Sequence, residues 1–418
     1  MRKKSILENG MRVITEAMPS VRSASIGIWV DVGSSAEAKE LRGISHMVEH
    51  MLFKGTTRRT AREIAEALDG VGGDLNAFTD KETTCYYAKV IDRHLPLALD
   101  VLADMLSHSL FDPSELSKER NVVLEEIKMY EDAPDDLVHE LFTQRLWADS
   151  DLGAPTIGTP ATVGALTSEN LHHHIAMHYA PNAVVLCAAG NVDHDAVVAL
   201  AREALGMRTG SSRLPVPARP VSAPQFAIRE KDSEQVHLVL GGPTVSARDE
   251  RRFALSVAQT ILGGGMSSRL FQEVREKRGL VYTITAYSST YREAGYLAVY
   301  GGTSLQNAQA CIDTILEQVE LLGRVPVSDA ELRLAKEHLK GSMTLALEST
   351  SSRMIRLGRQ ELVLGRELTP EEIEAKIDAV TAEEVAELAR LAFIPANRSL
   401  ALVGPAEATA VRWDIRGA

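Results

Sequence analysis

The chain has 418 residues, of which 45% are hydrophobic and 24% charged, as expected of a globular protein with two domains. Its net charge of −12 argues against nucleic acid and anionic membranes as partners and favours basic peptides. The three cysteines, Cys85, Cys187 and Cys311, are isolated, which excludes a disulfide framework and favours a reducing compartment.

The N-terminal residues predict a cytoplasmic protein. Residues 1–4 are basic, but a polar stretch follows at 8–10, so we expect no signal peptide. We also expect no membrane contact, because no apolar run is long enough to cross a bilayer.

The first elements in chain order are two strands, residues 11–15 and 23–32, followed by a helix that ends near Lys54 and Gly55. This helix contains His46-Met47-Val48-Glu49-His50. The two histidines are four residues apart and therefore share a face.

Two imidazoles at this spacing can bind one metal ion, and the carboxylate of Glu49 can reach a water on that ion. The order His-x-x-Glu-His is the inverzincin signature, the reverse of HExxH. Taken alone, the pattern is also compatible with a helix that happens to carry two histidines.

Four elements are predicted next: a helix over 61–68 capped by Thr60, strands over 75–79 and 83–90, and an amphipathic helix over 95–107. A further helix opens at Pro113 and carries Glu119 and Glu126 on one face, while Glu125 points about 100° away. A charged pair on an apolar stripe is costly unless it is coordinated or bonded. The alternative is a solvated acidic face.

A helix over 135–147, a buried strand over 183–189 and a helix over 193–205 complete the first half. The segment 209–226 is rich in Pro and Ser, which predicts a linker with a stiff, extended part. The predicted domains are therefore residues 1–208 and 227–418.

The second domain repeats the pattern of the first without its ligands. A strand over 236–241 and a helix over 250–262 follow the linker. When the two halves are aligned, the metal-motif positions are occupied by Ser256, Gln259, Thr260 and Ser342. This is the pattern expected of a duplicated domain in which one copy has lost its metal.

His46-x-x-Glu49-His50 followed by Glu126 resembles the zinc site of the M16 (pitrilysin) peptidase family, which includes insulin-degrading enzyme and the mitochondrial processing peptidase. The resemblance implies an α+β fold of the LuxS/MPP-like metallohydrolase architecture. In this fold, two similar α/β domains each have a mostly antiparallel sheet packed with helices, and only the first domain carries metal.

The same resemblance implies a zinc endopeptidase for unfolded or short peptides. His46, His50 and Glu126 would hold one Zn²⁺ per chain and leave one position for water. Glu49 would be the general base, and Glu119 would orient a histidine ligand from outside the ligand set.

Two further elements resemble substrate-binding parts of the family. Arg275 and Tyr282 match an Arg/Tyr pair that reaches the substrate carbonyl, and Arg278 is the alternative arginine. Asn76-Ala77-Phe78 matches an edge strand on which a peptide adds as an extra strand. An ordinary helix end and an ordinary paired strand are the alternatives.

The family's short members form homodimers, or heterodimers with an M16-like subunit, around a chamber that excludes folded proteins, and we expect the same here. The alternative function is a noncatalytic M16-like partner or scaffold subunit; a metal-dependent hydrolase of other bonds is a third reading without support. A separate cluster, His172, His173, His174 and His178, is interpreted as a surface helix rather than a ligand set.

Overall fold

The computed structural model describes residues 2–212 and 219–413, which form two compact units. Each unit combines one half of the sequence with a segment of the other half. Leu345–Glu367 belongs to the first unit, and Lys128–Gly153 belongs to the second. The predicted domains 1–208 and 227–418 therefore differ from the compact units, and part of the predicted linker, residues 213–218, lies outside the described residues.

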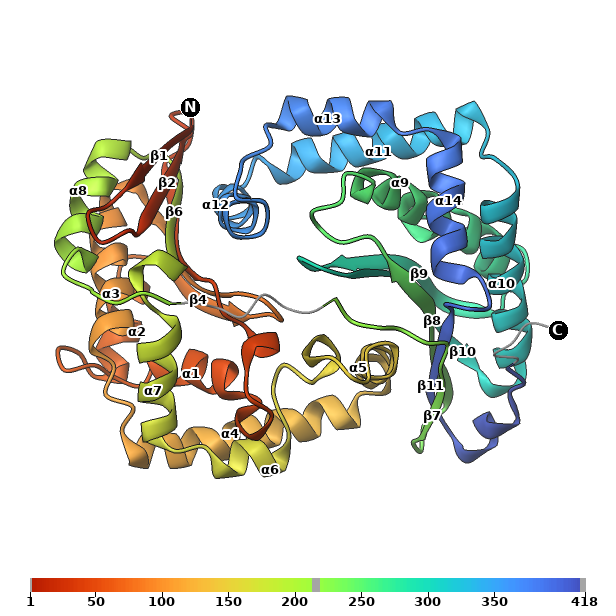
Figure 1. Ribbon diagram of the computed structural model, residues 1–418, viewed down its shortest axis with the longest axis horizontal. Coiled ribbons are helices and arrows are strands. Elements are labelled where there is room, and N and C mark those ends of the chain that lie inside the picture. Colours follow the sequence, from red (N-terminus) through yellow and green to blue (C-terminus); the bar gives the residue numbers. More distant parts are fainter. Residues whose placement is uncertain (1, 213–218, 414–418) are drawn as a thin grey trace. The chain divides into compact units, whose positions relative to one another are not determined.

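Within the described residues, the sheet of the first unit has six strands in the order β1-β2-β6-β3-β5-β4 (Figure 1). The strands are β1 (Arg2–Ile6), β2 (Arg12–Ala17), β3 (Ser23–Val30), β4 (Asp74–Thr79), β5 (Thr84–Ile91) and β6 (Val184–Gly190). β2 and β6 run parallel, and the other neighbours run antiparallel. β4 forms an edge of this sheet.

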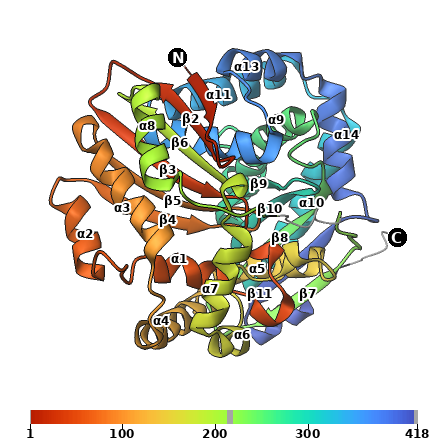
Figure 2. The same ribbon diagram turned by 60° about the vertical axis from the view of Figure 1, so that its left-hand side comes forward.

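Helices cover one face of this sheet, as Figure 2 shows for α3 and α8. They are α1 (Ile44–Leu52), α2 (Ala61–Asp69), α3 (Leu95–His108), α4 (Pro113–Asp132), α6 (Pro160–Ala165), α7 (Ser168–His178) and α8 (His194–Leu205). Because strand side chains alternate, Ile26 and Ile28 of β3 face these helices, whereas Trp29 faces away. Trp29 packs against α12 (Thr350–Arg359), which comes from the second half of the sequence.

The five described strands of the second unit have the order β7-β11-β8-β10-β9. They are β7 (Phe226–Glu230), β8 (Gln235–Thr244), β9 (Val281–Thr290), β10 (Gly295–Ser304) and β11 (Ser399–Gly404). One face is covered by α9 (Arg252–Gly263), α10 (Ala308–Arg324), α11 (Asp329–Ala346), α13 (Pro370–Ala379) and α14 (Ala382–Phe393). The other face packs against α5 (Pro134–Leu146), which comes from the first half of the sequence.

The fold prediction is confirmed: two α/β units have mixed, mainly antiparallel sheets packed with helices. Each of α5 and α12 packs on the sheet of the other half of the sequence, and this exchange was not predicted. An amphipathic helix shows which of its faces is buried but not which sheet buries it. No described helix combines the length and the apolar character needed to cross a membrane.

Candidate metal centre

Helix α1, which carries the metal motif, begins at a buried carboxylate from the preceding segment. Gly43, with φ of 93°, is the residue before the helix and makes no side-chain cap. Instead, Oε2 of Glu37 accepts a hydrogen bond from the N–H of Gly43 (2.7 Å), and Oε1 accepts one from the N–H of Ser45 (2.8 Å). These bonds satisfy two backbone N–H groups at the start of the helix, where the helix itself provides no acceptor. Burial raises the pKa of Glu37 to about 7, against the effect of both hydrogen bonds.

His46 and His50 on α1 converge with Glu126 on α4. Oε2 of Glu126 lies 3.6 Å from Nε2 of His50 and 3.9 Å from Nε2 of His46. One possible ligand atom from each of the three residues lies within 4.8 Å of the others, and the described residues contain no second such group. The structure thus brings together the three residues proposed from the sequence.

This donor set fits Zn²⁺. Within residues 2–212 and 219–413, the buried Oε2 of Glu126 accepts no hydrogen bond, so it lacks the compensation that a cation would supply. Burial, followed by the neighbouring His50, lowers the pKa of His46 to about 4, which keeps its imidazole neutral at pH 7, as metal binding requires. Two imidazole nitrogens and one carboxylate oxygen are a common zinc set that leaves a fourth position open.

Glu119 lies beside the three candidate ligands, next to Nδ1 of the His50 ring. Its Oε2 is 3.1 Å from Nδ1 of His50, and its Oε1 is 2.6 Å from Nζ of Lys54. With a proton on Nδ1 directed at Glu119, His50 presents the Nε2 lone pair to a metal. Glu125, in contrast, is exposed.

Glu49 lies between the two histidines in sequence and is held by the edge strand. Oγ1 of Thr79, at the end of β4, donates a hydrogen bond to Oε2 of Glu49 (2.6 Å). Burial raises the pKa of Glu49 above its usual value, and the Thr79 bond opposes this shift. A carboxyl with a raised pKa is a stronger base, which suits proton transfer near neutral pH.

Asn76, Ala77 and Phe78 lie on β4, at the edge of the sheet, as the prediction of a peptide-binding strand requires. Oδ1 of Asn76 accepts the N–H of Ala77 at 2.8 Å. The ring of Phe78 packs edge-on against Trp29, with 5.4 Å between centroids. Phe78 therefore helps to fix β4 on the sheet face opposite the metal residues.

Arg275 and Tyr282 lie together in the second unit. The guanidinium of Arg275 stands 5.2 Å from the centre of the Tyr282 ring, and Tyr282 is 77% exposed. Arg278 instead pairs with Glu317 at 3.2 Å. An exposed tyrosine stacked on an arginine is available for contact with a ligand, whereas Arg278 already has an acidic partner.

The histidine cluster on α7 is partly at the surface, as predicted: His172 and His173 are exposed, but His174 is not. His174 is buried, and its Nε2 lies 3.5 Å from Oγ of Ser45 on α1. Its ring is 4.7 Å from that of His178. Burial lowers the pKa of His174 to about 3, so it is a neutral core residue. The burial of His174 was not predicted because it depends on the packing of α7 against α1, a contact that the sequence of α7 does not reveal.

Sequence reasoning missed three residues around the site: Glu37, Thr79 and Lys54. Glu37 and Thr79 reach α1 from separate segments, so no local spacing indicates them. Lys54 had a usable signal, because it continues the four-residue spacing of His46 and His50.

The chain matches two family models. Residues 12–160 match "Insulinase (Peptidase family M16)", and residues 165–339 match "Peptidase M16 inactive domain". The first match contains all of the residues proposed to bind metal, and the second contains Arg275 and Tyr282.

Similar proteins cover nearly the whole chain. The "Uncharacterized zinc protease YmxG" of Bacillus subtilis is 45% identical over 97% of this chain and 98% of its own length. A Streptomyces coelicolor protein, also called an uncharacterized zinc protease, is 42% identical over 96% of this chain and 89% of its own. The crystal structure of a protease from Helicobacter pylori has the same fold, with a TM-score of 0.91, 20% identity and coverage of 97% and 99%.

Proposed function

The chain belongs to the M16 peptidase family, and we propose that it is a zinc-dependent endopeptidase that hydrolyses unfolded or short peptides. The observation that carries this proposal is the convergence of His46, His50 and Glu126 around a buried carboxylate oxygen without a hydrogen bond in the described structure. Relatives that span nearly the whole chain are named zinc proteases, which supports the coarser part of this proposal, a zinc peptidase.

In the proposed mechanism, His46 and His50 would hold one zinc ion through Nε2, and Glu126 would hold it through a carboxylate oxygen. When bound, zinc would act as a Lewis acid, which activates a water molecule and polarises the peptide carbonyl. Glu119 holds the proton on Nδ1 of His50 and thereby orients that ring.

Glu49 is the proposed general base. Thr79 engages Oε2, so Oε1 is the atom that takes the proton of the attacking water and later passes it to the leaving amine nitrogen. Because Thr79 belongs to β4, the base is held by the strand that we propose as the substrate-binding edge.

The substrate would add to β4 along Asn76, Ala77 and Phe78 as an extended strand. Main-chain pairing requires little of the peptide sequence, but it does require an unfolded segment. The N–H of Ala77 would exchange the Asn76 side chain for a substrate carbonyl.

Arg275 and Tyr282 are proposed to bind or polarise the substrate carbonyl. Their support is the contact of the Arg275 guanidinium with the exposed Tyr282 ring in the second unit, together with the resemblance to the family. We further propose that the chain functions as a dimer, either of two copies or with an M16-like subunit. A cytoplasmic location stays a prediction.

The test combines metal analysis of the purified full-length chain with a quenched-peptide assay. We expect one zinc per chain, hydrolysis of unstructured peptides, and loss of activity with a chelator that added zinc restores. Zinc binding without turnover of any tested peptide would favour the alternative, a noncatalytic M16-like subunit. A chain that binds no zinc would rule out the proposed mechanism.

A further inference from the structure

We propose that Lys54 is a positioning residue that holds the Glu119 carboxylate against His50, and that the buried carboxylate of Asp104 fixes the turn carrying Lys54. This inference rests on the proposed zinc site. It assigns a role to two charged groups that the proposed mechanism does not use.

Lys54 forms an ion pair with the buried carboxylate of Glu119. The Glu119 side chain is only 8% exposed, and its Oε1 lies 2.6 Å from Nζ of Lys54. A carboxylate this buried is costly without a partner of opposite charge. Since the other oxygen of Glu119 is 3.1 Å from Nδ1 of His50, the ion pair also fixes the acceptor that orients the His50 ring.

The turn that carries Lys54 is held by backbone hydrogen bonds. It follows the last turn of α1, where the N–H of Lys54 donates to the carbonyl of Met51 (3.1 Å). Immediately afterwards the backbone is tied to the end of α3. The carbonyl of Gly55 accepts the N–H of Leu110 (3.2 Å), and the N–H of Thr57 donates to the carbonyl of His108 (3.0 Å).

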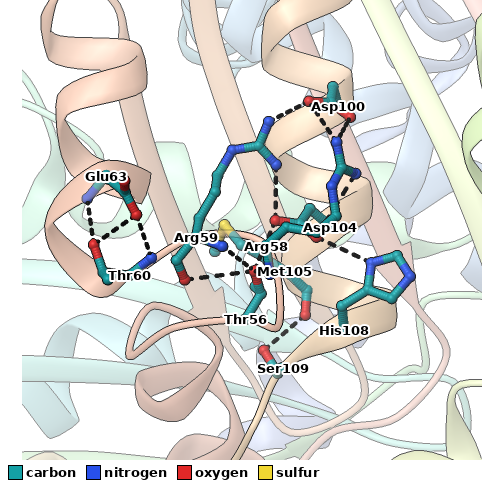
Figure 3. Close-up of polar contacts among 10 residues, drawn as sticks. All are labelled: Thr56, Arg58, Arg59, Thr60, Glu63, Asp100, Asp104, Met105, His108 and Ser109. Atoms are coloured by element: carbon teal, nitrogen blue, oxygen red, sulfur yellow. Dashed lines mark hydrogen bonds and ion pairs between the residues drawn. The ribbon is translucent and has the colours of Figure 1, made fainter.

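Asp104 on α3 lies at the centre of a network of hydrogen bonds and ion pairs, shown in Figure 3. Asp104 is fully buried, and its Oδ2 accepts hydrogen bonds from Oγ1 of Thr56 (2.8 Å) and from Nη1 of Arg59 (2.7 Å). Oγ1 of Thr56 in turn accepts the N–H groups of Arg58 (3.0 Å) and Arg59 (2.9 Å). Nδ1 of His108 lies 3.0 Å from the other oxygen of Asp104. The buried Asp104 carboxylate thus binds both Thr56 and Arg59 of the turn and fixes the turn to α3.

Together these contacts connect α3 to the metal site through Asp104, Thr56, Lys54 and Glu119. If the charge of Lys54 is removed, the buried Glu119 loses its cation and gains by turning towards water. That movement withdraws the acceptor from Nδ1 of His50, so the imidazole is no longer held in the orientation that zinc binding requires.

The experiment measures zinc affinity of the full-length chain by competition with a chelator. Lys54→Met keeps the apolar stem and removes the charge. Changes beside metal ligands typically weaken metal binding 10–100-fold, and we expect about tenfold here, measured at a temperature at which the metal-free variant is fully folded. The matched control is Lys118→Met, which removes an exposed lysine 2.6 Å from Glu115 on α4 and should leave zinc affinity unchanged.

A double variant distinguishes the positioning of Glu119 by Lys54 from a general effect of the Lys54 charge on zinc binding. In a Glu119→Gln background, Lys54→Met should weaken zinc binding less than twofold further, because no carboxylate remains to be held. Asp104→Asn should weaken zinc binding in the same direction as Lys54→Met.

Unchanged zinc affinity in Lys54→Met, or an undiminished effect of Lys54→Met in the Glu119→Gln background, would overturn the inference while leaving the zinc site intact. Absence of zinc binding by the unaltered chain would instead overturn the proposed function.

Discussion

At the residue scale, the site depends on the directions of side chains from two helices. The spacing of His46, Glu49 and His50 can be read from the sequence, because residues three and four apart share a helix face. The choice of Glu126 came from the family resemblance, since no local pattern indicates that α4 packs beside α1. The structure brings Glu126 to both imidazoles and leaves Glu125 exposed.

Glu126→Gln and Glu125→Gln test this difference on adjacent residues. Loss of a residue beside a ligand typically weakens metal binding 10–100-fold, so removing the proposed direct ligand Glu126 should cost at least that much. Glu125→Gln should be nearly silent. The measurement is zinc affinity by chelator competition, and the reverse order of effects would place the third ligand one residue earlier.

At the element scale, the helices and strands around the site were largely predictable. Residues 61–68 were expected to form a helix capped by Thr60, and α2 has this cap as part of a capping box with Glu63. The start of α1 was not predictable, because its donors are filled by Glu37 from a preceding segment. No sequence pattern marks a carboxylate that folds back onto the next helix.

The buried Glu37 predicts a pH dependence of stability. In the folded chain its carboxyl has a pKa of about 7, raised by burial from the value of 4.5 that it has when exposed. Between these values the unfolded chain binds fewer protons, so stability falls as pH rises. The shift corresponds to about 3 kcal/mol at most.

The measurement is the unfolding free energy of the metal-free chain between pH 4.5 and 8. Relative to Glu37→Gln, which does not titrate, the unaltered chain should lose stability as pH rises through about 7. Glu40→Gln, at an exposed neighbour, is the control and should follow the unaltered chain. Parallel curves for the unaltered chain and Glu37→Gln would contradict the raised pKa.

At the scale of the whole molecule, the sequence revealed two related halves but not the exchange between them. The linker and the repeated pattern both indicated domains that are continuous in sequence. In the structure, the second face of each sheet is instead covered by a helix from the other half, α12 or α5. This depends on shape complementarity between distant segments, which hydrophobic periodicity does not encode.

Gly358 tests whether α12 belongs to the first unit. A Cβ at this position would lie 2.2 Å from Cε2 of the buried Trp29, whereas a Cβ on Gly341 of α11 would meet no described atom within 4 Å. Replacing Gly by Ala inside a helix usually stabilises by about 1 kcal/mol. We therefore expect Gly341→Ala to be neutral or stabilising and Gly358→Ala to destabilise by about 1–3 kcal/mol in urea unfolding. Equal stability of the two variants would contradict the packing of α12 on Trp29.

We propose that Glu49 moves protons at a zinc site formed by other residues. The most direct test is Glu49→Gln, measured for zinc content and for peptide turnover in the same preparation. The amide keeps the shape of Glu49 but cannot take a proton from water. We expect one zinc per chain and turnover lower by about 10²–10⁴-fold. Near-normal turnover would contradict the role of Glu49 as base, and loss of zinc would show that Glu49 is a ligand.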